Sequence, residues 1–374
     1  MFRALSVGVA GFRRPVVIKR ILPQLASNKQ FVDMFIKEAS IAASLDHPNI
    51  VQVFDLGQDE GDLFMVLEHV PGIDLGVMVQ YYSDQGGGIP HELVAFAAVD
   101  VCKALECAHG QRDARGRLRP VIHRDVSPQN VLLSLSGSVK LADFGLAMAL
   151  GGTRATTPGI IKGKLGYMSP EQATGQRDLD IRSDLFSLGV VLYEALSGRR
   201  LFVGPTAAAT IQRVRTAQVP PLSEVAPSVP VVLAELVHSL LQRDRGDRPR
   251  SAQEVRRVLA RYLRTVQPPV DSNILARAVG QVVESLAHVS EQEQSDEVHT
   301  VAYAIQPPQA HPAGGDLDTT IRSEQGSQSL GSTVREPPLV LPDEEAPTFP
   351  VPSDGDGVLV RRVVTIGNDD DESR

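Results

Sequence analysis

Cysteine and long apolar runs are both scarce in this chain of 374 residues. The two cysteines, Cys102 and Cys107, lie in a helical-looking stretch at a spacing that does not suit a metal site. So few cysteines exclude a small scaffold held by disulfides, and we expect free thiols in a reducing compartment. The chain has neither an N-terminal signal pattern nor a run of about eighteen apolar residues. The sequence therefore predicts a cytoplasmic protein without a membrane span.

Acidic residues are concentrated in the C-terminal part, residues 267–374, which we call the tail. The net charge is −8, but the tail holds 19 acidic and 6 basic side chains, which leaves 31 basic and 26 acidic side chains before it. A mildly basic body suits ligands that carry phosphate, whereas an acidic tail opposes nucleic acid as the main partner of the whole chain. We therefore expect neither nucleic acid nor a membrane as a partner.

Two regions of different secondary structure precede the tail. Residues 1–70 contain β-branched and apolar runs of strand length, such as "RPVVIKRI" and "DLFMVLEHV", around one helix. Residues 71–266 contain long apolar helices, such as "HELVAFAAVDVCKALECAHG", joined by short strands. A sheet-rich region followed by a helix-rich region predicts an α+β fold with two lobes and a cleft between them.

The tail differs from these lobes in composition. It holds 11 of the 26 prolines, together with runs of Ser, Gln, Asp and Glu. Such a segment buries too little apolar surface to offset the entropy of ordering, so we expect it to be largely disordered. One stretch, 272–289, has the spacing of an amphipathic helix with Leu275, Val279, Val282 and Leu286 on one face.

A charged pair is predicted inside the first lobe. The helix expected from about Asn28 to Leu45 has an apolar stripe, and Glu38 lies beside it. A half-buried carboxylate needs a partner, because burying it alone costs several kcal/mol. The nearest candidate is Lys19, which ends the preceding strand "VVIK".

Five motifs, each weak alone, occur in a fixed order along the chain. They are "VIHRDVSPQNVLL", "VKLADFGLA", "GKLGYMSPEQ", "RSDLFSLGVVLYE" and "RDRGDRPRSAQEV". In these motifs the chain resembles a protein kinase, most of all the bacterial eukaryotic-like serine/threonine kinases. The resemblance implies a kinase domain over residues 1–266, with an N-lobe at 1–70 and a C-lobe at 71–266.

The resemblance assigns catalytic roles to residues between the lobes. Lys19 would hold the phosphates of ATP and pair with Glu38, and Asp125 would accept the proton of the substrate hydroxyl. Asn130 and Asp143 would hold Mg²⁺ (or Mn²⁺). Phosphoryl transfer needs these residue types, because it depends on a fixed cation, hard oxygen ligands and a carboxylate near the nucleophile.

Further residues receive binding or structural roles from the same resemblance. Leu67 would be the gatekeeper, and the backbone of Glu68 and Val70 would meet the adenine. Three more residues would be structural: Glu171 would pair with Arg248 to hold the activation segment (from "DFG" to "SPE"), and Asp184 would brace the backbone near "HRD".

Two residues depart from the pattern of the resembled family. That family has lysine two positions after the catalytic aspartate and threonine after the glycine before "Y-x-[AS]-P-E". Here those positions are Ser127 and Lys164. We hypothesise a reciprocal exchange in which Lys164 brings its ammonium to Asp125 and Ser127 supplies the hydroxyl. The alternative is an exposed activation-segment lysine.

Regulation is suggested by Arg124, which precedes the catalytic aspartate. Such an arginine implies control by activation-loop phosphorylation, because a phosphate there would pair with the guanidinium. Thr156 and Thr157 are the first candidate acceptors, and Thr153 is the next. The alternative is that these threonines are ordinary polar loop residues.

The N-terminus poses a separate question, because the resembled family has a glycine-rich loop upstream of Lys19 that this chain lacks. Met1 falls where that family has a valine. In one interpretation the true start lies upstream, and the protein is an ordinary kinase. In the other the chain lacks the loop, binds ATP weakly and serves as a pseudokinase or docking module. The intact Asp125, Asn130 and Asp143 favour the first.

The substrate class is predicted as serine and threonine hydroxyls of proteins, because "GKLGYMSPE" is closer to serine/threonine-type segments than to tyrosine-type ones. A small-molecule kinase would lack the "SPE" segment and its partner arginine. The tail also contains threonines in "DTTIR" and "STVRE". Phosphorylation of these threonines could create a docking site for a phosphothreonine-binding partner.

Overall fold

The computed structural model describes residues 1–8, 12–21, 26, 28–59, 62–144, 164–176, 178–302 and 363–365. The chain divides into two units, Met1–Gln292 with Arg362–Arg374 and Glu293–Arg361. The described part of the second unit is the end of one helix, α12 (Ser272–Ala302).

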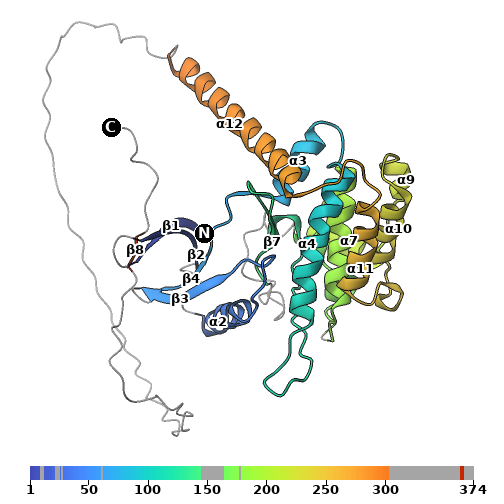
Figure 1. Ribbon diagram of the computed structural model, residues 1–374, viewed down its shortest axis with the longest axis horizontal. Helices are drawn as coiled ribbons and strands as arrows, with labels where there is room; N and C mark the ends of the chain where they lie inside the picture. Colours follow the sequence, from blue (N-terminus) through green and yellow to red (C-terminus); the bar gives the residue numbers. More distant parts are fainter. Residues whose placement is uncertain are drawn as a thin grey trace, which may run out of the picture. The chain divides into compact units, whose positions relative to one another are not determined.

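The N-lobe is built on an antiparallel sheet with the strand order β3-β4-β2-β1-β8 (Figure 1). Its strands are β1 (Phe2–Val7), β2 (Arg13–Arg20), β3 (Val53–Asp59), β4 (Asp62–Glu68) and β8 (Val363–Thr365). The last of these comes from the tail, and Leu5 of β1 lies opposite Thr365. The sequence predicted a largely disordered tail, and the three-residue strand β8 lies within it, in "RRVVTI", which has β-branched residues.

Strand β2 shows why the sheet presents Lys19 to the cleft. Side chains alternate between the two faces of a strand. Val16 and Ile18 are buried on one face with Ala4 and Val66. Val17 and Lys19 therefore share the opposite face, where Val17 packs with a second apolar cluster.

Helix α2 (Lys29–Ala43) supplies the partner of that lysine. The side chain of Asn28 caps the helix by accepting a hydrogen bond from the backbone N–H of Gln30, which satisfies one of its free amides. Phe35, Ala39 and Ala42 form the buried stripe, as the spacing predicted. Glu38 lies next to that stripe.

The C-lobe contains a small antiparallel sheet and most of the helices (Figure 1). The strands are β5 (Gly72–Asp74), β6 (Val131–Ser134) and β7 (Val139–Leu141). The α-helices are α3 (Leu75–Asp84), α4 (His91–His109), α6 (Pro170–Ala173), α7 (Arg182–Ser197), α8 (Ala207–Thr216), α9 (Leu222–Val225), α10 (Val231–Leu240) and α11 (Ala252–Leu263). Short 3₁₀ helices are η2 (Pro128–Asn130), η4 (Leu165–Tyr167) and η5 (Arg245–Asp247).

Helix α7 is the centre of the C-lobe core. Every residue from Ser183 to Ser197 is buried, so this helix is covered on all sides. It ends at Gly198, whose φ of 66° is the left-handed conformation that favours glycine. The buried α7 provides a fixed base for the segments that carry the site.

Helix α12 begins at Ser272, where the sequence predicted a helix, but it continues beyond 289 to Ala302. Leu275, Val279 and Val282 are buried in the C-lobe core, so the first half of this helix packs with the domain rather than belonging to a separate tail. Leu286, predicted on the same face, is 46% exposed, because it lies beyond the last turn that meets the core.

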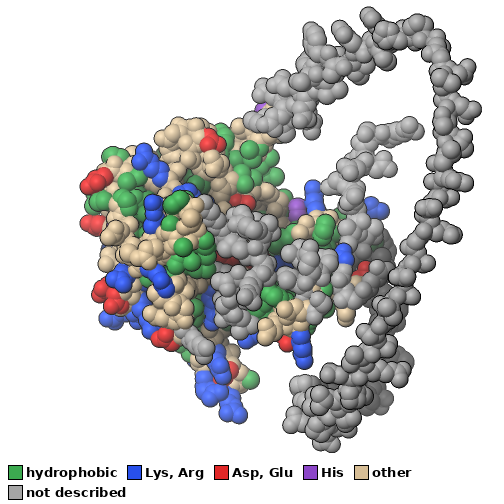
Figure 2. Space-filling model, turned by 180° about the vertical axis from the view of Figure 1, so that it is seen from behind, with side chains coloured by type: hydrophobic (Ala, Val, Ile, Leu, Met, Phe, Trp, Pro, Cys, Tyr) green, Lys and Arg blue, Asp and Glu red, His purple; other side chains and the backbone are tan. Residues whose placement is uncertain are grey.

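An arginine-rich hairpin follows α4. The bridge between Arg112 and Leu118 closes it, and its exposed side chains include Arg115 and Arg117. In Figure 2 blue side chains gather at the lower tip, where Figure 1 places this hairpin. None of the helices in the described ranges is long and apolar enough to span a bilayer.

Candidate functional site

Lys19 joins the two lobes through two carboxylates. Its Nζ lies 2.7 Å from Oε1 of Glu38 on α2 and 2.9 Å from Oδ1 of Asp143, which follows β7 in the C-lobe. Burial alone would lower the pKa of the Lys19 ammonium, but the carboxylates of Asp143 and Glu38 raise it above its ordinary value. Lys19 therefore stays protonated and provides a fixed positive charge in the cleft.

The loop around Asp125 and Asn130 forms the second part of the site. Nδ2 of Asn130 donates to the backbone oxygen of Asp125 at 2.7 Å and to its Oδ2 at 3.0 Å. Asn130 occupies the last position of η2, whose first residue is Pro128. The two side chains are thereby held together, and the side-chain amide oxygen of Asn130, Oδ1, is left to accept a ligand.

Lys164 and Ser127 both lie beside Asp125. Nζ of Lys164 is 2.5 Å from Oδ2 of Asp125, which is well within direct contact. Ser127 is completely buried, and its Oγ has no hydrogen-bond partner among the described residues. The contact between Lys164 and Asp125 that the exchange hypothesis requires is therefore present, whereas no described contact involves the hydroxyl of Ser127.

The carboxylate of Asp184 on α7 binds the backbone of the "HRD" segment through hydrogen bonds. Its Oδ2 accepts the backbone N–H of His123 and its Oδ1 accepts that of Arg124, both at 2.8 Å. Arg124 and Asp143 have φ values of 69° and 55°, a conformation that costs non-glycine residues roughly 1–3 kcal/mol. Two of the three described non-glycine residues with positive φ thus flank the site.

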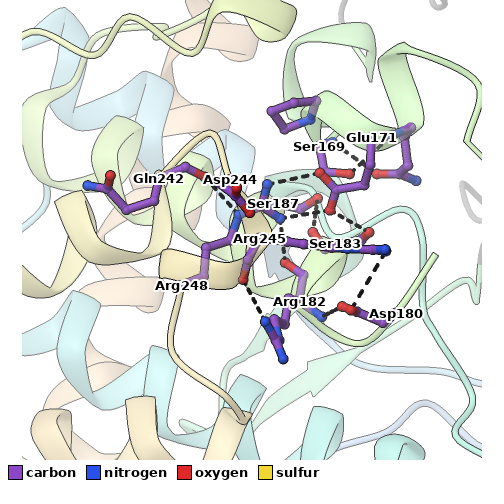
Figure 3. Close-up of polar contacts among 12 residues, drawn as sticks. Ser169, Glu171, Asp180, Arg182, Ser183, Ser187, Gln242, Asp244, Arg245 and Arg248 are labelled. Atoms are coloured by element: carbon purple, nitrogen blue, oxygen red, sulfur yellow. Dashed lines mark hydrogen bonds and ion pairs between the residues drawn. The ribbon is translucent and has the colours of Figure 1, made fainter. Parts of the chain in front are cut away.

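Glu171 and Arg248 form a bidentate ion pair inside the C-lobe (Figure 3). The two nitrogen–oxygen distances are 2.7 and 2.9 Å, and Ser183 donates to the same carboxylate at 2.8 Å. Arg248 also donates to backbone oxygens of Arg182, Gln242 and Arg243. This network connects the end of the activation segment to α7 and to the turn before α11.

Replacing Glu171 by glutamine is expected to lower the free energy of unfolding at neutral pH by roughly 3–5 kcal/mol, because it leaves the buried guanidinium of Arg248 uncompensated. Burial opposes ionisation of Glu171, but Arg248 lowers its pKa below the ordinary 4.5. A lowered pKa stabilises the fold above that value, and the effect is lost as the pH falls through the folded-state pKa. The difference from wild type, measured by urea unfolding, should therefore shrink below about pH 4.5.

Glu106→Gln provides a matched control for that experiment. Glu106 also binds an arginine, Arg256, through two contacts, but both side chains are partly exposed, at 26% and 32%. We expect a loss of less than about 1 kcal/mol at this surface pair. Equal losses for the two variants would contradict the role assigned to the buried Glu171 pair.

A mostly apolar pocket opens beside Lys19. Leu67, Glu68 and Val70, the residues predicted to meet the adenine, all line it. Its other lining residues include the apolar Met1, Val17, Met65, Leu132 and Ala142 from both lobes and the polar Glu38, Asn130 and Asp143. An apolar pocket with a few charged and polar groups suits a base with phosphates attached.

Asn130 and Asp143 fit a divalent cation of the Mg²⁺ type. Hard cations prefer carboxylate and amide oxygens, and both residues line the same pocket. Among the described contacts, Lys19 binds Oδ1 of Asp143, which leaves Oδ2 of this carboxylate to bind a cation. The donor set therefore suits Mg²⁺ together with the phosphates of a nucleotide.

Two further residues that hold the site were not singled out from the sequence. Nε2 of Gln172 donates to the backbone oxygen of Arg124 at 2.9 Å, and His109 contacts Asp184 at 2.8 Å. The pattern Ser169-x-x-Gln172, a capping box at the start of α6, could have indicated Gln172. No local signal identifies His109.

The phosphorylation candidates Thr153, Thr156 and Thr157 lie outside the described residues. Their proposed partner Arg124 is described, and its Nε is buried without a hydrogen-bond partner in the described ranges. A guanidinium is the side-chain group that most often pairs with phosphate.

Residues 9–259 match the protein kinase domain family. The chain belongs to that family. It is 37% identical over 263 residues to the tyrosine-protein kinase MasK of Myxococcus xanthus, covering 70% of this chain and 41% of MasK. It is 37% identical to the serine/threonine-protein kinase PknL of Mycobacterium tuberculosis, covering 66% of this chain and 58% of PknL. It is 36% identical to the serine/threonine-protein kinase PknB of Mycobacterium leprae, covering 71% of this chain and 41% of PknB.

These similarities confirm the recognition of a bacterial kinase of the eukaryotic-like type. They also agree with the antiparallel N-lobe sheet and the helical C-lobe, so the predicted two-lobed kinase fold is confirmed. The kinase chain spans less than two thirds of the length of each of these three relatives.

Proposed function

We propose that this kinase transfers the terminal phosphoryl group of ATP to serine and threonine hydroxyls of proteins. The observation that carries the proposal is the juxtaposition of two linked groups at one pocket. Lys19, Glu38 and Asp143 form the first group, and Asp125 with Asn130 forms the second. Together they provide a cation for phosphates, oxygen ligands for a metal and a carboxylate for a hydroxyl proton.

The proposed mechanism follows from these positions. Lys19 holds the phosphates of ATP, and Glu38, which lines the pocket, fixes the position of the lysine ammonium. Mg²⁺ or Mn²⁺, when held by Asn130 and Asp143, would neutralise charge on the phosphates. Asp125 orients the substrate hydroxyl and accepts its proton as the oxygen attacks the phosphorus.

We propose that activation-loop phosphorylation controls this activity. The support is Arg124, whose buried Nε is unpaired in the described part of the chain and whose backbone is held by both Asp184 and Gln172. A phosphate on Thr156, Thr157 or Thr153 would pair with it. The threonines of "DTTIR" and "STVRE" in the tail are proposed as docking sites for a phosphothreonine-binding partner, and they lie outside the described residues.

The names of the relatives support protein hydroxyls as acceptors but differ in the hydroxyl. PknL and PknB are named serine/threonine-protein kinases, whereas MasK is named a tyrosine-protein kinase. The "GKLGYMSPE" segment supports serine and threonine for this chain. Phosphoamino-acid analysis of the product separates the two.

The test is incubation of the full chain with Mg²⁺-ATP, next to an Asp143→Asn variant. We expect phosphoserine and phosphothreonine in the wild-type chain and at least a 10²-fold lower rate in the variant, because the variant loses a charged metal ligand. Nucleotide binding without transfer in the wild type would instead indicate a docking module. Phosphotyrosine alone would contradict the proposed substrate class.

A further inference from the structure

Lys164 is held in place by the segment that follows it. It directly precedes η4, whose residues Leu165 and Tyr167 are buried in the C-lobe. The hydroxyl of Tyr167 donates to Oε2 of Glu194 on α7 at 2.6 Å. Gly166 lies between Leu165 and Tyr167 in the sequence. It is so close to the backbone oxygen of Phe202 that an added Cβ would be 2.7 Å from that oxygen. The position of Lys164 is therefore set by packing onto α7.

A second contact ties this segment to the catalytic loop. Ser169 and Gln172 form a capping box at the start of α6, and Gln172 donates to the backbone oxygen of Arg124. Arg124 immediately precedes Asp125. The segment 164–172 and the loop that carries Asp125 are thus connected at two points, by Gln172 and by the ammonium of Lys164.

The ammonium of Lys164 meets the same oxygen of Asp125 that Asn130 contacts. The carboxylate of Asp125 is 11% exposed, and Lys164 and Asn130 both donate to its Oδ2. Lys19 makes the corresponding ion pair with Asp143. The site therefore has two lysine cations, one on each of the two carboxylates that face the reaction.

We propose that Lys164 is a catalytic residue that supplies the cation on the nucleophile side of the transfer. The proposal rests on the proposed kinase function and adds a residue from the activation segment to it. Ser127, two residues after Asp125, is the position at which the resembled family has lysine, and here its buried hydroxyl lacks a partner in the described ranges. The cation is carried instead by the segment that also holds Glu171.

The chemical step leaves Lys164 charged throughout. The hydroxyl oxygen of the substrate forms a bond to the γ-phosphorus while the bond from that phosphorus to the bridging oxygen breaks. The bond's electron pair leaves with ADP, and the hydroxyl proton passes to Asp125. Lys164 stabilises negative charge on the transferring group, and preorganised charges of this kind typically contribute about 10²–10³ in rate.

Because the cation belongs to the activation segment, the site is complete only when residues 164–172 are docked. A lysine at position 127 would be present whatever the segment does. In this chain, undocking of the segment that holds Tyr167 on Glu194 would also remove the charge of Lys164 from Asp125. Docking of residues 164–172 on the C-lobe therefore also places the ammonium of Lys164 on Asp125.

The test compares Lys164→Thr with the double variant Ser127→Lys/Lys164→Thr in the full chain. We expect Lys164→Thr to lower kcat by about 10²-fold while the Kd for Mg²⁺-ADP stays within twofold of wild type. The kcat of the double variant should be at least about tenfold higher than that of Lys164→Thr, because the new lysine restores a cation next to Asp125. Lys103→Thr, which removes the partly exposed ion pair with Asp100, is the control and should leave both values unchanged.

Ser127 is buried, so a lysine there could fail to fit, and a second rescue is needed. Lys164→Cys treated with 2-bromoethylamine rebuilds an ammonium of similar reach, and the treated wild type controls for reaction at Cys107, which is partly exposed. Recovery of kcat in either rescue supports the proposal. A Lys164→Thr kcat within twofold of wild type, or a loss that neither rescue reverses, overturns it. A wild type that transfers no phosphate contradicts the kinase function itself.

Discussion

Replacing Asp125 by asparagine is expected to lower the rate of phosphoryl transfer by about 10³-fold while leaving nucleotide binding intact, since general base catalysis typically contributes 10²–10⁴-fold. Asparagine keeps the shape of the side chain and can still accept hydrogen bonds, so the contacts from Asn130 and Lys164 have an acceptor. It cannot take the substrate proton. The isosteric amide preserves an acceptor for Asn130, which lines the nucleotide pocket, so the Kd for Mg²⁺-ATP should change by less than about threefold.

Asp100→Asn is the matched control for this variant. Asp100 forms an ion pair with Lys103 at 2.7 Å on α4, outside the site. Stopped-flow or quenched single-turnover measurements separate the transfer step from binding. A single-turnover rate for Asp125→Asn within about tenfold of wild type would assign proton removal to another group.

Lys19→Met is expected to weaken the binding of Mg²⁺-ATP and to lower kcat/KM by at least about 10²-fold. The methionine retains most of the volume of the lysine stem but removes the charge that two carboxylates share. Glu38 and Asp143 then lie in the same half-buried cleft without the cation between them, and their repulsion displaces Asp143 from the pocket. Both the position of the phosphates and the metal site depend on that residue.

Glu38→Gln separates the two parts of this effect. It removes the negative charge of one partner of Lys19 but leaves the cation and its contact with Asp143, so we expect a smaller loss of kcat/KM than for Lys19→Met. Lys103→Met, a lysine with the same kind of contact on the surface, should have no effect. If Lys19→Met bound Mg²⁺-ATP as tightly as wild type, Lys19 would not be a phosphate-binding residue.

The sequence allowed much of the site to be predicted because its contacts follow from short-range geometry. Alternation along β2 puts Val17 and Lys19 on one face, and the stripe on α2 puts Glu38 next to it. The five-residue interval between Asp125 and Asn130 is short enough for one 3₁₀ turn to join them. These relations hold within one strand, one helix or one loop.

Contacts that depend on packing between distant segments could not be predicted in the same way. The direct contact of Lys19 with Asp143 requires the two lobes to meet, and neither segment encodes that distance. The positive φ of Arg124 is equally hidden, because arginine has no local preference for that conformation. Burial of Leu275 against the C-lobe core also required a partner surface that the amphipathic pattern alone does not name.

The most direct test of the proposed kinase function is transfer from one chain to another. The wild-type chain is mixed with Mg²⁺-ATP and a size-tagged Asp125→Asn chain, and phosphate on each is mapped by mass spectrometry. We predict phosphoserine or phosphothreonine on the tagged chain when the wild type is present, and an at least 10²-fold lower rate of its appearance when Asp143→Asn replaces the wild type. Bound nucleotide with no phosphate on either chain would contradict the assignment of Asp125, Asn130 and Asp143 to phosphoryl transfer.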